Sequence, residues 1–280
     1  MSTVNSVSGG KTSAYLAAHY PADFDVFALV RIEDPKSAPK DPMLKREAER
    51  RTGQEFIATA EDDLTLYAVL DLEQFIGRTI HWVTGLTYDE VIRTRGGWLP
   101  NMLHRYCTVS MKLEPLMEFY RKHVGIPPAV RIGFRANEMS RAQKMLERCD
   151  EEGVITMKCV VGKWPNGNNR WDELPFQIPE FPLIRDRIYK DRIEQYWKDK
   201  PVRFAPLNNC VGCFNREPLL LRKMFTEHPE KMEWFASQEQ GRVRGAFRSD
   251  IRYERIAKMF PQLELNYADF SECDSGHCGV

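Results

Sequence analysis

Two of the seven cysteines in this chain of 280 residues, Cys210 and Cys213, form a C-x-x-C pair. This spacing is typical of half a metal site or of a redox pair, because a short loop can point both thiolates at one centre. Two thiolates do not complete a metal site, so a more distant ligand must join them. A chain this long buries a large core without cross-links, so the odd cysteine set indicates ligands, redox groups or buried apolar side chains rather than a disulfide framework.

A second motif, Ser8-Gly9-Gly10-Lys11-Thr12-Ser13, lies between a strand-like and a helix-like segment. Glycines at such a turn let backbone amides approach an anion, and the helix N-terminus and the hydroxyls add further donors. The spacing matches neither the Walker loop nor the dinucleotide fingerprint, and the alternative is an ordinary glycine turn with a helix cap. The position in the chain and the full hexapeptide favour a phosphate-binding loop.

The elements that must position these residues alternate along the first half of the chain. The expected strands are Thr3–Val7, Phe24–Val30, Thr79–Val83 and Ala129–Phe134. Helical spacing predicts Lys11–His19, Pro42–Arg51, Asp63–Phe75, Tyr88–Arg93, Lys112–His123 and Ser140–Cys149. This alternation predicts an α/β fold with an open, mostly parallel sheet and flanking helices.

The segment 163–182 contains four prolines and an Asn-Gly-Asn-Asn run, which is typical of irregular chain. We place a loop or a change of subdomain there. This divides the chain into a nucleotide-binding α/β region, 1–162, and a Pro-rich connection with a mostly helical, cysteine-bearing region, 163–280. Apolar residues in the last third recur at helical spacing.

Five segments, in the same order, resemble the phosphoadenylylsulfate (PAPS) reductase-like family of the adenine nucleotide α-hydrolase (PP-loop ATP pyrophosphatase) superfamily. The hexapeptide at 8–13 is similar to its S-G-G-x-x-S pyrophosphate loop. The other segments are Arg105–Thr108 followed by Lys112 and Pro115-Leu116, then Gly133–Arg141, Phe181–Tyr196 and Asn209–Cys213. No single segment is specific, but the combination is. The resemblance implies a Rossmann-like fold.

The resemblance also implies an adenine nucleotide, ATP or an adenylylsulfate, as the bound cofactor or substrate. Residues 8–13, Glu33 and Arg135 are the expected nucleotide contacts, with Mg²⁺ as a further candidate near Glu33. Lys112 is an expected catalytic cation, because it falls near the carboxyl ends of the strands, where open α/β sheets bind ligands.

Cys107 lies in a segment that the resemblance associates with iron–sulfur chemistry, so we expect it to join Cys210 and Cys213 as a metal ligand. A [4Fe–4S] cluster needs a fourth thiolate, for which Cys273 and Cys278 are available, or it keeps one open position. Structural zinc is the alternative, since thiolates suit both. Cys149 and Cys159 are expected to be packing residues.

The C-terminal segment with Cys273 and Cys278 resembles the cysteine tail with which sulfonucleotide reductases attack sulfur, although its spacing differs. Both cysteines are therefore candidate catalytic thiols. His277 lies beside them and could lower the pKa of a thiol. A reversible disulfide between the two cysteines is a further reading.

The leading hypothesis is an enzyme that cleaves ATP at its α-phosphate and transfers sulfur with iron–sulfur assistance. A reductase of an adenylylsulfate that uses Cys273, and a non-catalytic nucleotide-binding protein with structural zinc, are the alternatives. We expect a sulfur donor or a thioredoxin-like electron donor as partner. The sequence leaves open whether the chain forms a homo-oligomer. Forty basic and forty acidic residues balance, which gives no support to tRNA or DNA as substrate, and without an apolar span or signal we expect a cytoplasmic protein.

Overall fold

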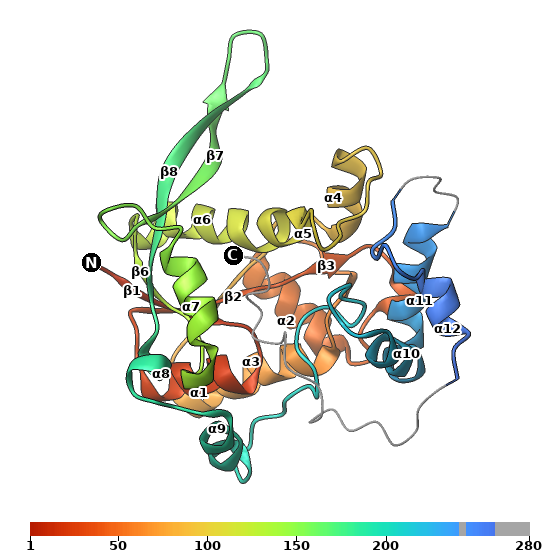
Figure 1. Cartoon of the computed structure of the whole chain (residues 1–280), viewed down its shortest axis with the longest axis horizontal. Coiled ribbons are helices and arrows are strands. Elements are labelled where there is room, and N and C mark those ends of the chain that lie inside the picture. Colours follow the sequence, from red (N-terminus) through yellow and green to blue (C-terminus); the bar gives the residue numbers. More distant parts are fainter. Residues whose placement is uncertain (241–244, 261–280) are drawn as a thin grey trace.

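The computed structural model describes residues 1–240 and 245–260. Its central six-stranded sheet has the order β5-β2-β1-β6-β8-β7 (Figure 1). The strands are β1 (Thr3–Val7), β2 (Phe24–Ala28), β5 (Ile80–Val83), β6 (Ala129–Arg131), β7 (Ile155–Lys163) and β8 (Asn169–Glu180). All neighbours pair in parallel except β7, which is antiparallel to β8. The expected α/β fold with a mostly parallel sheet and flanking helices is confirmed.

Helices cover both faces of this sheet because its central strands are apolar on both sides. Val26 of β2 packs with Leu116 and Met145 on one face, whereas its neighbour Phe27 packs with Leu16 and Leu66 on the other. The first face is covered by α6 (Glu114–Phe119) and α7 (Met139–Leu146), and the second by α1 (Lys11–His19), α2 (Pro42–Thr52) and α3 (Asp63–Ile76). These helices follow the periodicity predicted from the sequence.

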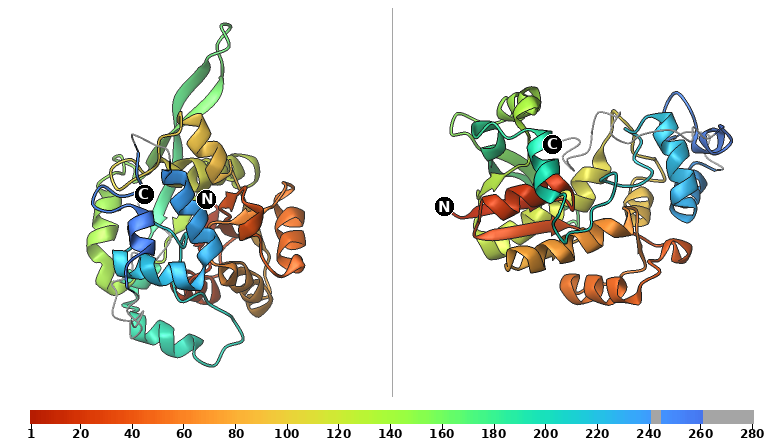
Figure 2. Two further views of the ribbon diagram at one scale, coloured as in Figure 1. Left: turned by 90° about the vertical axis from the view of Figure 1, so that its right-hand side faces the viewer. Right: turned by 90° about the horizontal axis from the view of Figure 1, so that it is seen from below.

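A third cluster of buried side chains joins the C-terminal helices to the rest of the molecule. Met224, Phe235 and Tyr253 pack there against Val30 and Tyr88. The helices of the described C-terminal residues are α8 (Pro182–Arg185), α9 (Lys190–Trp197), α10 (Pro218–Glu227), α11 (Pro229–Glu239) and α12 (Tyr253–Ala257). The expected helical character is confirmed for this part, which lies beside the sheet (Figure 2).

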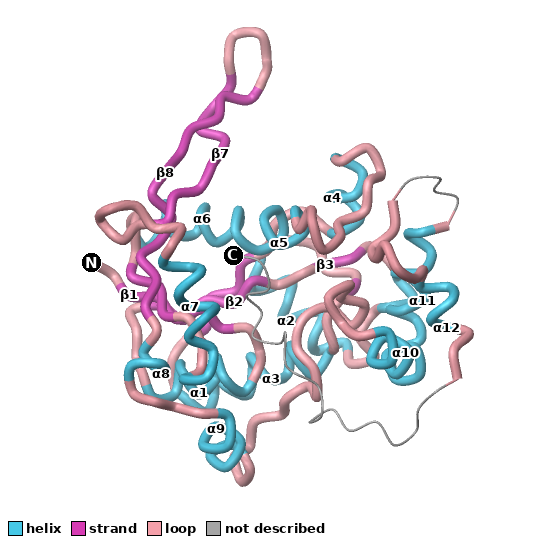
Figure 3. The backbone as a smooth tube through the Cα atoms, viewed as in Figure 1, coloured by secondary structure: helices cyan, strands magenta, loops and turns pink. Residues whose placement is uncertain are grey.

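The expectation of irregular chain over 163–182 is wrong. Most of this segment is β8, which pairs with β6 and forms a long hairpin with β7 (Figure 3). Pro175 sits beside a register shift between the two strands, where a missing backbone N–H is tolerated. β8 thus continues the sheet past residue 162, and the proposed division into 1–162 and 163–280 stays a prediction.

One continuous helical stretch carries several of the predicted site residues. It consists of α5 (Tyr106–Thr108), the π-helical turn η2 (Val109–Leu113), α6 and a second π-helical turn, η3 (Tyr120–Val124). π-helical turns within helices are frequent at functional sites. The remaining elements are α4 (Tyr88–Thr94), the short strands β3 (Arg31–Ile32) and β4 (Ala58–Thr59), and the turns η1 (Pro35–Ser37) and η4 (Ala136–Glu138).

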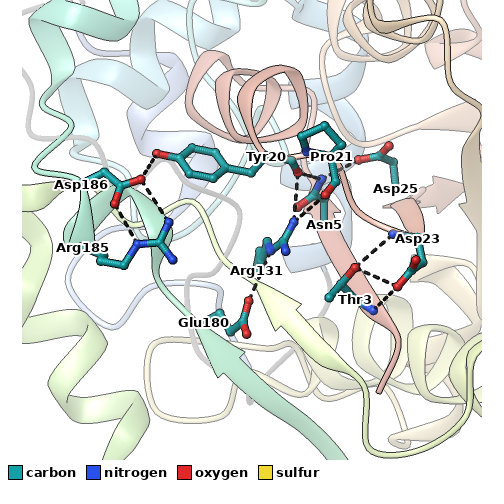
Figure 4. Close-up of polar contacts among 10 residues, drawn as sticks. All are labelled: Thr3, Asn5, Tyr20, Pro21, Asp23, Asp25, Arg131, Glu180, Arg185 and Asp186. Atoms are coloured by element: carbon teal, nitrogen blue, oxygen red, sulfur yellow. Dashed lines mark hydrogen bonds and ion pairs between the residues drawn. The ribbon is translucent and has the colours of Figure 1, made fainter.

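A polar network fixes the C-terminal end of α1 to the sheet (Figure 4). Asn5 Nδ2 and Arg131 Nη1 both donate to the carbonyl of Tyr20, at 2.9 and 3.2 Å. The Tyr20 hydroxyl donates to Asp186 at 2.7 Å. Because a helix is rigid, this network also sets the position of its opposite end, which begins the glycine loop. No helix among the described residues has both the length and the apolarity needed to cross a membrane.

Candidate functional site

The glycine loop has the backbone of a strand-to-helix anion site. Gly9 adopts φ +75°, which favours glycine, and Gly10 caps α1 without a side-chain hydrogen bond. The Ser13 hydroxyl accepts a hydrogen bond from the Ser8 amide at 3.0 Å and donates to the Gly10 carbonyl at 3.1 Å. Hydrogen bonds within the loop therefore fix its shape. No capping side chain of the described residues accepts from the first-turn amides of α1, so none competes with an anion for them.

Close neighbours leave no room for side chains on this loop. A Cβ at Gly10 would lie 2.1 Å from Nδ2 of Asn208, and one at Gly9 would lie 2.6 Å from Cγ2 of Thr65. Gly133, which follows β6, stands against Thr12 and Ser13 in the same way, with its Cβ position 3.3 Å from Cγ2 of Thr12. The glycine loop, the end of β6 and the segment that leads to Cys210 thus meet at one place.

A small cavity opens at this place, between the central strands and the helical stretch α5–η2. Ser8 from the loop, Val26 and Ala28 from β2, and Thr108 and Lys112 from the helical stretch line it. Its walls are mainly apolar, with a few polar groups at the loop end. This is the crevice beyond the carboxyl ends of the strands, where open α/β sheets hold ligands.

A second cavity shares Thr108 and Lys112 with the first one. It is lined by all three predicted metal ligands, Cys107, Cys210 and Cys213. Cys107 thus lies near the Cys210–Cys213 pair, although about one hundred positions separate it from that pair in the chain. Tyr88, Arg105 and Phe214 complete much of the wall.

Packing fixes the cysteine loop on both sides. The Val211 amide donates to the carbonyl of Ala60 at 2.8 Å, and the Tyr253 hydroxyl donates to the carbonyl of Gly212 at 2.9 Å. A Cβ at Gly212 would lie 2.3 Å from Cδ2 of Phe235, so only glycine fits between the two cysteines here. The loop is thus held between the segment after β4 and helix α11.

Cys107 and Cys210 lie in an environment that disfavours their thiolate forms. Burial raises the pKa of Cys107 to about 11, and the neighbouring Cys213 adds to this. Burial also raises the pKa of Cys210, with the Glu61 carboxylate adding to the effect and Lys112 opposing it. A bound metal cation would offset this penalty, because its ligands bind as thiolates.

A buried ion pair joins the two cavities. Lys112 Nζ lies 3.0 Å from Oε1 of Glu61, whose side chain is almost fully buried. Burial lowers the pKa of Lys112, but the Glu61 carboxylate raises it, and the net shift is upward. Lys112 therefore stays charged, as a cation for phosphate requires. Glu61 is not among the residues predicted from the sequence, because no motif includes it.

The remaining predicted residues lie as follows. Lys11 pairs with Glu194 of α9, and Arg135, two residues beyond Gly133, pairs with Glu138 at 3.0 Å. Glu33 lines neither cavity; it accepts hydrogen bonds from Arg93 at 2.8 Å and borders a different, larger cleft. Cys273 and Cys278 lie outside the described residues.

The donor set of the second cavity fits a thiolate-bound metal in its chemistry: three cysteines face the same space, and sulfur ligands suit both zinc and iron–sulfur clusters. As folded, the described residues contain no group of three or more His, Cys, Asp or Glu side chains already gathered closely enough to hold a metal ion. The Nε atom of Arg105, at the wall of this cavity, is buried and has no hydrogen-bond partner among the described residues. No family model, curated protein or solved structure matches this chain.

Proposed function

We propose that this chain is a PAPS reductase-like member of the adenine nucleotide α-hydrolase superfamily, which cleaves ATP at its α-phosphate and transfers sulfur to the activated substrate. The observation that carries the proposal is the pair of adjoining cavities. The glycine loop borders the first, the three cysteines border the second, and Thr108 and Lys112 line both. Phosphate chemistry and sulfur chemistry would therefore occur side by side.

In this proposal the amides of residues 8–13 and the ammonium of Lys112 bind the polyphosphate of ATP. An oxygen of the acceptor forms a bond to the α-phosphorus, and the bond from that phosphorus to the bridging oxygen breaks, which releases pyrophosphate. A sulfur nucleophile from a donor then displaces AMP from the adenylated acceptor. Lys112 stabilises the charge on the leaving pyrophosphate, and Glu61 holds the Lys112 ammonium in place by accepting its hydrogen bond.

Cys107, Cys210 and Cys213 would hold the metal group. An iron–sulfur cluster there would supply a bound sulfur or an electron route beside the nucleotide, whereas zinc would only fix the loop. The chain's own contribution is to keep the thiols together and dry, because the cavity lies among buried apolar side chains.

The test is pyrophosphate release by the anaerobically purified protein with ATP, Mg²⁺, a sulfide donor and either tRNA or DNA as acceptor. The Lys112→Met, Glu61→Gln double variant removes both charges of the buried pair together, so the fold is expected to survive. We expect release to fall roughly a hundredfold. The matched control is Lys258→Met with Glu254→Gln, which removes an exposed ion pair on α12.

Each other outcome points to a different function. Sulfite from an adenylylsulfate, lost on Cys273→Ser, would replace the proposal with the reductase and its thioredoxin-like donor. ATP binding with no turnover, together with colourless protein that contains zinc, would indicate a nucleotide-binding protein without catalysis. Release that the double variant leaves unchanged would remove Lys112 from the site.

A further inference from the structure

The hairpin of β7 and β8 stands clear of the body of the molecule (Figures 1 and 2). From the Met157–Leu174 pair to the Lys163–Asn169 pair, β7 advances six residues, or about 20 Å at the usual rise of a strand. Met157, Cys159 and Leu174 still pack on the sheet's core at the base. Beyond them, both strand edges are open.

The tip of the hairpin, residues 160–171, presents aromatic and basic side chains, and two exposed acids, Asp172 and Glu173, follow it on β8. Val160 and Trp171 are partners across the strands, so they share one face, and they are 41% and 50% exposed. Trp164, at the turn, is 53% exposed. The only charged residues from 160 to 171 are Lys163 and Arg170, and neither makes an ion pair within the described chain. Solvent-exposed tryptophans beside unpaired cations are typical of a contact surface.

The same chain contains a cleft of opposite character, with a volume of about 890 Å³. Its wall carries the carboxylates of five glutamates, two of which are paired: Glu33 with Arg93 and Glu118 with Lys122. The other three are Glu55, Glu90 and Glu114. Leu86, Ile57 and Pro115 add apolar surface between them. Arg31, at the base of the cleft, is buried. Its guanidinium donates hydrogen bonds to the side chains of Thr84 and Gln54 and to the carbonyls of Glu55 and Gly85. The exposed Glu55 and Glu114 have no ion pair among the described residues.

No hairpin residue lines this cleft, so the tip does not fill the cleft of its own chain. One element links the two features: α6, which supplies Glu114, Pro115 and Glu118 to the cleft, lies beside the base of the hairpin in Figure 1. Glu114 is also close enough to influence the Cys159 thiol of β7. The cleft of one copy is therefore left open to the tip of a second copy.

We propose that two copies of this chain associate by exchanging hairpins, with each tip inserted into the acidic cleft of the other copy. Lys163 and Arg170 then meet Glu55 and Glu114, and Trp164 and Trp171 cover the apolar wall. The contact is reciprocal and closed, as two-fold symmetry requires, and it covers open strand edges. A nucleic acid would also attract the tip, but the matching acidic cleft and the balanced charge of the chain favour a second copy. This inference is independent of the proposed function.

Charge exchange between two variants tests the proposal. Lys163→Glu with Arg170→Glu makes the tip acidic, and Glu55→Lys with Glu114→Lys makes the cleft basic; all four positions are exposed. Sedimentation velocity and light scattering over a concentration series should show a dimer for the original chain, weakened by salt. Either variant alone should self-associate roughly a hundredfold more weakly, because like charges meet. Mixing the two should restore a dimer, since both contacts of the mixed pair are then complementary.

The matched control is Lys144→Glu with Arg148→Glu, two exposed cations on and just after α7, which should leave the dimer intact. Circular dichroism confirms that each variant is folded. A chain that stays monomeric at every concentration, a dimer that the tip variant does not weaken, or a mixture that does not recover would each overturn the proposal. Binding of single-stranded RNA or DNA by a monomer, lost on Trp171→Ala, would do so in favour of a nucleic-acid contact.

Discussion

Gly10 is the residue at which the glycine loop touches the segment that leads to Cys210. Its φ of −98° suits any residue, so only the contact with Asn208 excludes a side chain. Gly10→Ala should therefore displace Asn208, lower the free energy of unfolding by about 1–3 kcal/mol and weaken ATP binding. Urea denaturation and calorimetric titration with ATP measure the two effects.

A second substitution makes this prediction specific to the contact. Asn208→Ala should restore much of the stability lost in Gly10→Ala, because it removes the side chain that clashes with the new methyl group. Gly162→Ala is the control, since its Cβ position has no atom within 4 Å. If Asn208→Ala fails to compensate, the loop is limited by something other than this contact.

The residues of the candidate site differ in how far the sequence could predict them. Residues 8–13 and the Cys210–Cys213 pair follow from local motifs, and Cys107 follows from the family resemblance. Ser8 lines one cavity and the three cysteines line the adjoining one, while their roles stay predictions. Glu61 has no motif, because its role comes from burial opposite Lys112, which is 51 positions away. Asn208 matters for the site because its side chain packs directly against Gly10 and leaves no room for a Cβ there. Such roles depend on packing, which periodicity does not encode.

At the scale of elements, the link from Tyr20 to Asp186 ties α1 to the turn after α8. Burial, followed by the hydrogen bond to Asp186, raises the pKa of Tyr20 to about 12, and the hydrogen bonds from Arg185 and Tyr20 lower the pKa of Asp186 to about 2. The stability from Tyr20 is complete below pH 10 and is lost as the pH rises towards 12. The stability from Asp186 is complete above pH 3.8 and is lost as the pH falls towards 2.

Tyr20→Phe should therefore destabilise the protein by about 1 kcal/mol between these limits, and the difference from the original chain should shrink above pH 10. Urea denaturation at a series of pH values measures it. Tyr189→Phe, at an exposed tyrosine just before α9, is the control and should leave the free energy of unfolding nearly unchanged. An undiminished difference above pH 12 would show that the hydroxyl does not carry the effect.

The elements that the sequence predicted best are those with one buried face. Regular apolar spacing predicted the two helices α1 (Lys11–His19) and α3 (Asp63–Ile76), and both are present. The hairpin was missed because its outer half buries almost nothing and its strand β8 contains prolines. Neither the alternation of apolar residues nor the turn residues could separate such an arm from a loop.

At the scale of the whole molecule, the cysteines connect two regions that are distant in sequence. Cys107 belongs to the helical stretch on the sheet, whereas Cys210 and Cys213 lie between α9 and α10, and all three line one cavity. A metal held there would link these regions. Removing it with a chelator under anaerobic conditions should lower Tm by roughly 5 °C or more, since binding free energy contributes to folding. Cys210→Ser should lose the metal and the shift, while Cys149→Ser should keep both. Quantified iron, zinc and sulfide, with calorimetric melting curves, measure this; chelation that leaves Tm unchanged would contradict the link.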